Sequence, residues 1–428
     1  MRFVAVALCC ALLTLASSSA EAAGAFATAL PTVAKDLGGD ASQGSLVVAS
    51  PLVSDVPAPK GEDLALRIAS LLAGKIGGET RAHPQTATLA GARAVAGKAK
   101  ALVFLGIEIQ KGQLRITADR YPVLGNSWDR LRLTAPPPSA HAFAQAPLDA
   151  EVRTFLAPIV LEQASLTKAG HSEGEVLAAT CGDVDGDGSI ELVLVSRARV
   201  AIGRIRGAQF VPQTVAPWSA LAPLAGAPLR EAIGGAWLEG PGRLYVSTTD
   251  RGGAVVDGAL ALRERFLGVP FGGRCALPKP EIGGFFGNLV ACAAAVKPDA
   301  TKTPPRFDAG AAMHRIKPNG TEDDLVVVRD IGTTKVRRLG EDKVLFDGAG
   351  AQLAMGDLDM DGIPEIVTSL DGSDDAVRIV SASDDGAVRE RRRFSAPNGV
   401  RALAMCPPEE KGIPALVAVT GHEVWLVR

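Results

Sequence analysis

Residues 182–195 read GDVDGDGSIELVLV, and residues 356–367 read GDLDMDGIPEIV. Both stretches place carboxylates at loop positions 1, 3, 5 and 9, a glycine at position 6, and an aliphatic run directly afterwards. Calcium takes six to eight oxygen ligands at about 2.3–2.6 Å, so acids at this density can converge on one ion. The β-branched and aliphatic run that follows predicts a strand. The two loops therefore predict a calcium-binding protein built largely of β-strands.

Each loop offers four carboxylates and one backbone carbonyl as ligands. The first loop would use Asp183, Asp185, Asp187, the Ser189 carbonyl and Glu191, and the second would use Asp357, Asp359, Asp361, the Ile363 carbonyl and Glu365. Gly188 and Gly362 stand where the chain must turn sharply, and glycine tolerates the positive φ that such a turn needs. We expect two Ca²⁺ sites per chain.

Two other interpretations compete with this one. An EF-hand needs flanking helices and a bidentate Glu at position 12, but that position is Leu194 in the first loop and Thr368 in the second. An acidic turn that binds no metal stays open, although two copies sharing the ninth-position Glu disfavour it.

The pattern Asp-x-Asp-x-Asp-Gly-x-x-Glu resembles the calcium loops of the FG-GAP/VCBS repeat family, which form integrin-α-type β-propellers. That family more often carries Asp at position 9. The resemblance implies a propeller in which each loop joins the first two strands of a blade.

The repeat extends beyond the acidic copies. LAM at 353–355 with GIPEIV at 362–367 returns as LAM at 403–405 with GIPALV at 412–417, where Ala415 replaces the ninth-position Glu. Weaker echoes add residues 243, 288 and 324, so that loop position 9 falls at 191, 243, 288, 324, 365 and 415. Spacings of about 40–50 residues suit propeller blades. We expect six blades, with five or seven possible, and a closing strand taken from upstream near Ile159–Leu166.

Composition narrows the possible partners. The net charge of −2 makes no electrostatic case for binding nucleic acid or an anionic membrane. Aromatic residues make up only 4% of the chain, which argues against a stacking platform for sugars or bases.

The N-terminus has the layout of a secretory signal peptide. Arg2 is followed by an apolar run over residues 3–15 and by Ala20-Glu21-Ala22, a cleavage motif. No other run reaches the length needed for a transmembrane segment. We expect export to the periplasm, the cell surface or the exterior, where disulfides are permitted. Cys275 and Cys292 are the favoured pair, while Cys181 and Cys406 are expected to be small buried core residues.

The domain plan follows from these segments. We expect a signal peptide over 1–22, a low-complexity segment over 23–44, a small α/β domain over 45–133, a Pro-rich linker over 134–150 and the propeller over 151–428. The α/β domain would hold a strand at 45–54, helices at 62–76 and 87–100, and a hairpin of strands at 101–109 and 113–121. Its order resembles the small domain of TolB- and CsgG-like envelope proteins.

No catalytic motif is apparent in the sequence. The five histidines are dispersed, and there is no P-loop, GxGxxG or nucleophile elbow. We therefore expect a monomeric, non-catalytic binding or scaffold protein that engages a protein or glycan on a propeller face. The alternative is a propeller hydrolase or lyase whose site is assembled from separate blades.

Overall fold

The computed structural model describes residues 24–38, 44–110, 112–124, 136–221, 232–266, 268–279, 285–292, 306–316, 322–339, 343–383, 386–408 and 413–428. The expected signal peptide, over 1–22, lies outside these ranges. The described residues fall into two compact units, the first holding residues up to 51, 65–107 and 115–146 and the second residues 52–64, 108–114 and 147–428. Among the described residues, no helix has both the length and the apolar character needed to cross a membrane.

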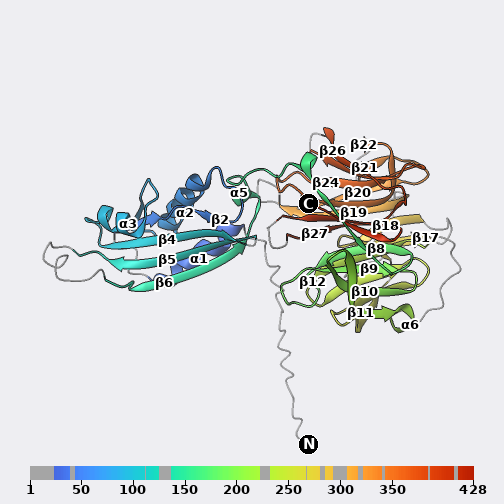
Figure 1. The fold of residues 1–428 in the computed structure, drawn as a ribbon, viewed down its shortest axis with the longest axis horizontal. Coiled ribbons are helices and arrows are strands. Elements are labelled where there is room, and N and C mark those ends of the chain that lie inside the picture. Colours follow the sequence, from blue (N-terminus) through green and yellow to red (C-terminus); the bar gives the residue numbers. More distant parts are fainter. Residues whose placement is uncertain are drawn as a thin grey trace, which may run out of the picture. The chain divides into compact units, whose positions relative to one another are not determined.

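The first unit has an α/β fold that combines one β-sheet with helices (Figure 1). Its strands run in the order β3-β1-β4-β5-β6, with β2 also paired to β4, and β1 is parallel to both β3 and β4. The helices and strands up to residue 147 are α1 (Ala25–Asp36), β1 (Ser45–Ala49), β2 (Val53–Ser54), α2 (Gly61–Ile76), β3 (Arg81–Ala82), α3 (Leu89–Val95), β4 (Ala101–Gln110), β5 (Gln113–Pro122) and β6 (Ala140–Pro147).

Three of these elements were not expected from the sequence, namely α1, the two-residue strand β3 and β6. Helix α1 lies in the segment treated as low-complexity, and it buries Phe26, Leu30 and Val33 on one face. Strand β6 lies in the segment treated as a linker, where Ala142, Ala144 and Ala146 alternate with exposed neighbours. In α1 and β6 alanine supplies much of the buried face, which makes the apolar periodicity weak in the sequence.

The second unit consists of antiparallel strands joined by short turns. After α5 (Ala150–Arg153) and the 3₁₀ turn η2 (Leu161–Gln163) come β7 (Leu166–Gly170), β8 (Val176–Gly182), β9 (Glu191–Ser196), β10 (Arg199–Arg206), β11 (Gln209–Pro217) and the short helix α6 (Trp218–Leu221). The chain continues through β12 (Gly234–Gly240), β13 (Arg243–Thr248), β14 (Gly252–Val256), β15 (Leu262–Phe266), β16 (Val269–Phe271), β17 (Arg274–Lys279), β18 (Phe285–Ala291), β19 (Phe307–Ile316) and β20 (Glu322–Asp330). It ends with β21 (Val336–Arg338), β22 (Val344–Phe346), β23 (Ala349–Gly356), β24 (Glu365–Leu370), β25 (Ala376–Ala382), β26 (Val388–Ser395), β27 (Val400–Cys406), β28 (Ala415–Thr420) and β29 (Glu423–Val427).

These strands form a β-propeller with six blades in the described part of the chain. The blades are β8–β11, β12–β15, β16–β18, β19–β22, β23–β26, and β27–β29 completed by β7. Two pairs of blades share a continuous sheet only through single residue pairs, Gln209 with Gly170 and Phe286 with Phe307. The expected fold class, a mainly β propeller of about six blades preceded by a small α/β domain, is confirmed.

The hydrophobic core of the propeller lies between neighbouring blades. One cluster joins Val193 and Val200 of blade one to Leu244 of blade two, and another joins Leu194 of blade one to Val417 of blade six. Further clusters join blades three and four, four and five, and five and six. Packing of each blade face on the next is the sheet-on-sheet burial that a propeller requires.

Glycines let the inner strands approach closely. A Cβ at Gly234 would lie 2.7 Å from the Cβ of Leu177, and one at Gly235 would lie 2.5 Å from Cγ1 of Val269. Strand β12 therefore fits between its neighbours only because these two positions carry no side chain.

The ring closes as expected from the sequence, a few residues further along the chain. Strand β7 begins at Leu166 and pairs antiparallel with β29, with Leu166 opposite Val427 and Gly170 opposite Glu423. The last blade thus takes its outer strand from upstream of the first blade, and β7 pairs with the edge of β29.

Six residues were expected at loop position 9 of the six blades. Five of them begin or lie in the second strand of a blade. The exception is Asn288, which lies in β18, the third strand of blade three. The first strand of that blade, β16, has three residues and is joined to β17 through Gly272 and Gly273, both at positive φ. The tight turn places the second strand earlier in the sequence than the repeat spacing indicated.

The described cysteines form two disulfides. Cys275 pairs with Cys292 as favoured from the sequence. Cys181 and Cys406 were expected to be unpaired core residues, and that expectation was wrong, because they are bonded with Cα atoms 5.1 Å apart. Their equivalent positions at the ends of β8 and β27 place the two sulfurs side by side once the ring closes.

The Cys181–Cys406 bond should make the larger contribution to propeller stability. It links residues 225 apart in sequence, whereas Cys275–Cys292 links residues 17 apart. We expect Cys181→Ala/Cys406→Ala to lower the free energy of unfolding by about 2–4 kcal/mol, since the longer loop gains more entropy when unfolded. Urea unfolding followed by tryptophan fluorescence measures this, with Cys275→Ala/Cys292→Ala as the matched control. A larger loss in the control pair would contradict the prediction.

Candidate metal loops and the central channel

The first acidic loop connects β8 to β9 and is held by its own carboxylates. Asp183 accepts hydrogen bonds from the backbone N–H groups of Gly186, at 2.7 Å, and Gly188, at 3.0 Å. Glu191, which is 2% exposed, accepts from the N–H of Val184 at 3.0 Å. Carboxylate oxygens of Asp183, Asp185 and Glu191 gather within 4.8 Å of one another, a separation that could hold a metal ion.

A guanidinium lies beside this first loop. Arg204 of β10 donates from Nε to Glu191 at 2.8 Å and from Nη2 to Asp187 at 2.9 Å. Asp187 is not among the gathered carboxylates, because it turns toward Arg204 instead. Hydrogen bonds from the Ser189 N–H and from Arg204 lower the pKa of Asp187, and those to Asp187 and Glu191 raise the pKa of Arg204.

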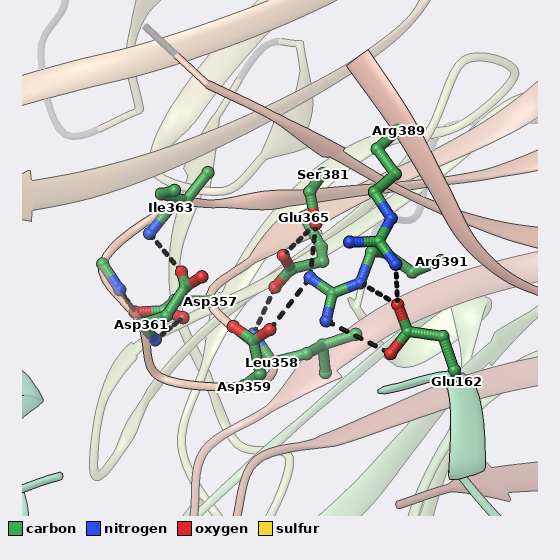
Figure 2. Close-up of polar contacts among 11 residues, drawn as sticks. Glu162, Asp357, Leu358, Asp359, Asp361, Ile363, Glu365, Ser381, Arg389 and Arg391 are labelled. Carbon is green, nitrogen blue, oxygen red and sulfur yellow. Dashed lines mark hydrogen bonds and ion pairs between the residues drawn. The ribbon is translucent and has the colours of Figure 1, made fainter. Parts of the chain in front are cut away.

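The second acidic loop, between β23 and β24, is shown in Figure 2. Here Asp357 accepts from the N–H groups of Asp361 and Gly362, each at 3.0 Å. The carboxylates of Asp357, Asp359 and Asp361 gather within 4.8 Å. Glu365 is outside that group and accepts from the Leu358 N–H and the Ser381 hydroxyl, both at 2.8 Å.

A buried glutamate without a cationic partner distinguishes the second loop. Glu365 is fully buried and is bonded only to neutral donors, while the side chain of Asp359 is 6% exposed. Arg391 donates to one oxygen of Asp359 at 3.1 Å, and the other oxygen, Oδ1, is buried without a hydrogen-bond partner. Burial raises the pKa of Glu365 to about 8 and that of Asp357 to about 6, with neighbouring carboxylates adding to both shifts.

The backbone of the two loops follows one path despite different residues. At loop position 6, Gly188 and Gly362 have φ of 82° and 86°, as their expected roles require. At position 4, Gly186 has φ of 84°, but the second loop places Met360 there with φ of 57°. A side chain in the left-handed region costs about 1–2 kcal/mol, so the hydrogen bonds of the loop must hold it there.

Most of the carboxylates predicted as ligands therefore converge, with two exceptions. The structure brings together Asp183, Asp185 and Glu191 in one loop and Asp357, Asp359 and Asp361 in the other. Asp187 turns to Arg204, and Glu365 stands behind its aspartates. The backbone N–H groups of Ser189 and Ile363 each donate to the position-5 aspartate of their own loop. A buried oxygen without a hydrogen-bond partner and a cluster of hard carboxylate oxygens fit a divalent cation in the second loop.

The propeller encloses a central channel lined by the first strands of all six blades. Its volume is about 1610 Å³, and Gly, Ala and other small or apolar residues make up much of its lining. Charged side chains on the wall include Arg274, His314, Asp324 and Arg401. This lining could not be predicted from the sequence, since the residues come from strands far apart in the chain.

One polar cluster on the channel wall was missed by sequence reasoning. His314 of β19 has its Nδ1 3.0 Å from an oxygen of Asp324 in β20, and Arg274 of β17 donates to the other oxygen. The hydrogen bond with His314 is the main cause that lowers the pKa of Asp324. All three side chains are partly exposed.

Comparisons with known proteins show weak similarity to several solved structures. A scan against protein-family models and a search of curated proteins both find no match. A streptogramin B lyase has 10% identity and a TM-score of 0.34, covering 63% of this chain and 99% of that one. The PQQ-bound aldose sugar dehydrogenase of Streptomyces coelicolor has 11% identity and a TM-score of 0.39, with the same coverage. TolB of Acinetobacter baumannii has 12% identity and a TM-score of 0.25, covering 90% and 94%. The fold assignment rests on the strand order described above, and membership of the FG-GAP/VCBS family stays a prediction.

The buried Glu365 predicts an unusual pH dependence for protein stripped of metal. Its pKa of about 8 in the folded state exceeds the ordinary 4.5, so the folded protein keeps a proton that the unfolded chain releases. We expect the melting temperature of the metal-free protein to fall as the pH rises from about 5 to 8, because the unfolded state binds fewer protons there.

Scanning calorimetry across this pH range measures the slope. The variant Glu365→Gln has no proton to lose at this site, so its slope should be flatter than that of the wild type. A melting temperature that rises with pH equally in both proteins would contradict the burial described here.

Proposed function

We propose that this chain is an exported, calcium-binding propeller that binds a protein or glycan partner through its channel and the adjoining face. The observation that carries the proposal is the channel itself, lined by all six blades and about 1610 Å³ in volume. Concave sites of this kind are the usual place for a ligand to bind.

Calcium would act as a brace in this proposal. The acidic loops follow β8 and β23, and Asp183 and Asp357 are on the channel lining. An ion bound there would fix the strand ends next to the channel. Hard carboxylate oxygens and a tight loop favour Ca²⁺ over softer metals.

Export is supported by the signal-like N-terminus and by the two disulfides. Disulfides persist in oxidising compartments such as the periplasm or the exterior and are rare in the cytosol.

A propeller hydrolase or lyase is the second candidate function. It is favoured by the contact between His314 and Asp324, since a histidine oriented by a carboxylate is a common general base. Its position on the channel wall would give it access to a bound substrate.

Capture from a cell-envelope extract tests the binding function. Immobilised full-length protein, with about 1 mM Ca²⁺ or with chelator, should retain a component that mass spectrometry identifies. The variant Arg401→Glu reverses an exposed charge on the channel wall and should reduce recovery at least tenfold. The matched control Arg392→Glu reverses an exposed charge on β26, away from the channel lining, and should retain it.

Two outcomes would count against this proposal. Equal loss in both variants would show that the channel is not the binding surface. A captured component that is chemically converted by the wild type and not by Asp324→Asn would favour the enzyme instead.

A further inference from the structure

The two acidic loops carry their carboxylates at the same four positions but are followed by different third strands. In blade five, Glu365 of β24 lies directly opposite Ser381 of β25. In blade one, Leu192 of β9 lies opposite Gly203 of β10, so the next pair along brings Glu191 opposite Arg204. Arginine and serine thus occupy the same place in the two blades, next to the ninth-position glutamate.

The guanidinium of Arg204, on β10, forms its ion pairs with the first acidic loop. Both of its carboxylate partners, Asp187 and Glu191, are residues expected to bind calcium. Glu191 is 2% exposed, so its charge would need a partner in any case, and the guanidinium supplies it. A Ca²⁺ ion in this loop would have to displace Arg204 or share Glu191 with it. If both bound Glu191, the two positive charges would lie close together and repel each other.

Arg391 does not play the same part in blade five. It donates to Glu162 through Nε at 2.8 Å and reaches the loop through a single oxygen of Asp359, at 3.1 Å. Figure 2 shows it between Asp359 and Glu162, with Asp357 and Asp361 on the far side of Asp359. The buried Oδ1 of Asp359 has no hydrogen-bond partner among the described residues, so this oxygen could coordinate a cation.

We propose that the blade-five loop is the single high-affinity Ca²⁺ site and that Arg204 is a built-in cation that replaces the metal in blade one. This inference rests on the proposed calcium-binding function and refines the expectation of two equal sites. The residue opposite the ninth-position glutamate, serine or arginine, decides whether a loop with this carboxylate pattern binds an ion.

Calorimetric titration of the full-length chain with CaCl₂ tests the proposal. The wild type should take up one Ca²⁺, Asp359→Asn should lose it, and Asp183→Asn should keep it. The variant Arg204→Ser copies the blade-five arrangement and should take up two. The control Arg206→Ser removes a second arginine of β10, which is not one of the loop's partners. This variant should still take up one Ca²⁺.

Ser381→Arg is the reverse exchange and should abolish uptake while the protein still melts cooperatively. Thermal melting of every variant, in Ca²⁺ and in chelator, separates a lost site from a lost fold. Only variants that retain the blade-five site should be stabilised by Ca²⁺.

The remaining outcomes distinguish the two proposals. Uptake of two ions by the wild type, one lost in each aspartate variant, would overturn the role of Arg204 and leave calcium binding intact. A folded Arg204→Ser that still takes up one ion would also overturn that role. No uptake by the wild type would overturn calcium binding itself.

Discussion

The pairing of β7 with β29 is the constraint on which the propeller depends. Five residue pairs join β7, the first strand of the propeller, to β29, its last, and the Cys181–Cys406 bond joins blade one to blade six near the channel. Trp425 of β29 is buried in a cluster that also includes Leu161, just upstream of the closing strand. Without this closure the first strands of the blades would not surround a channel, and the acidic loops would lose their fixed neighbours.

The closing segment is also linked to the second acidic loop, through Arg391 of β26. Glu162, in the turn η2 that leads to β7, accepts hydrogen bonds from Arg391, and Arg391 in turn donates to Asp359. One short chain of charged groups therefore runs from the ring closure to the candidate cation site. Other arginines of β26 form similar pairs: Arg389 donates to Glu162, and Arg393 donates to Glu390 of the same strand.

Sequence reasoning succeeded where the signal was local and repeated. The strands after both loops begin at Glu191 and Glu365, and the helix expected at 62–76 is α2. It failed where the deciding contact joins distant residues. Neither the partner of Cys181 nor the approach of Arg204 to Glu191 can be read from spacing, because both depend on how strands align after folding. It also failed where alanine replaced larger apolar residues, as in α1 and β6.

Hydrogen–deuterium exchange of the full-length chain, with and without Ca²⁺, tests the central claim most directly, because it reports on each loop separately. The account predicts that Ca²⁺ slows exchange of the amides over residues 357–365, where a cation would complete the coordination of Asp359, and leaves residues 183–191 unchanged. Equal protection of both loops, or protection confined to residues 183–191, would contradict it.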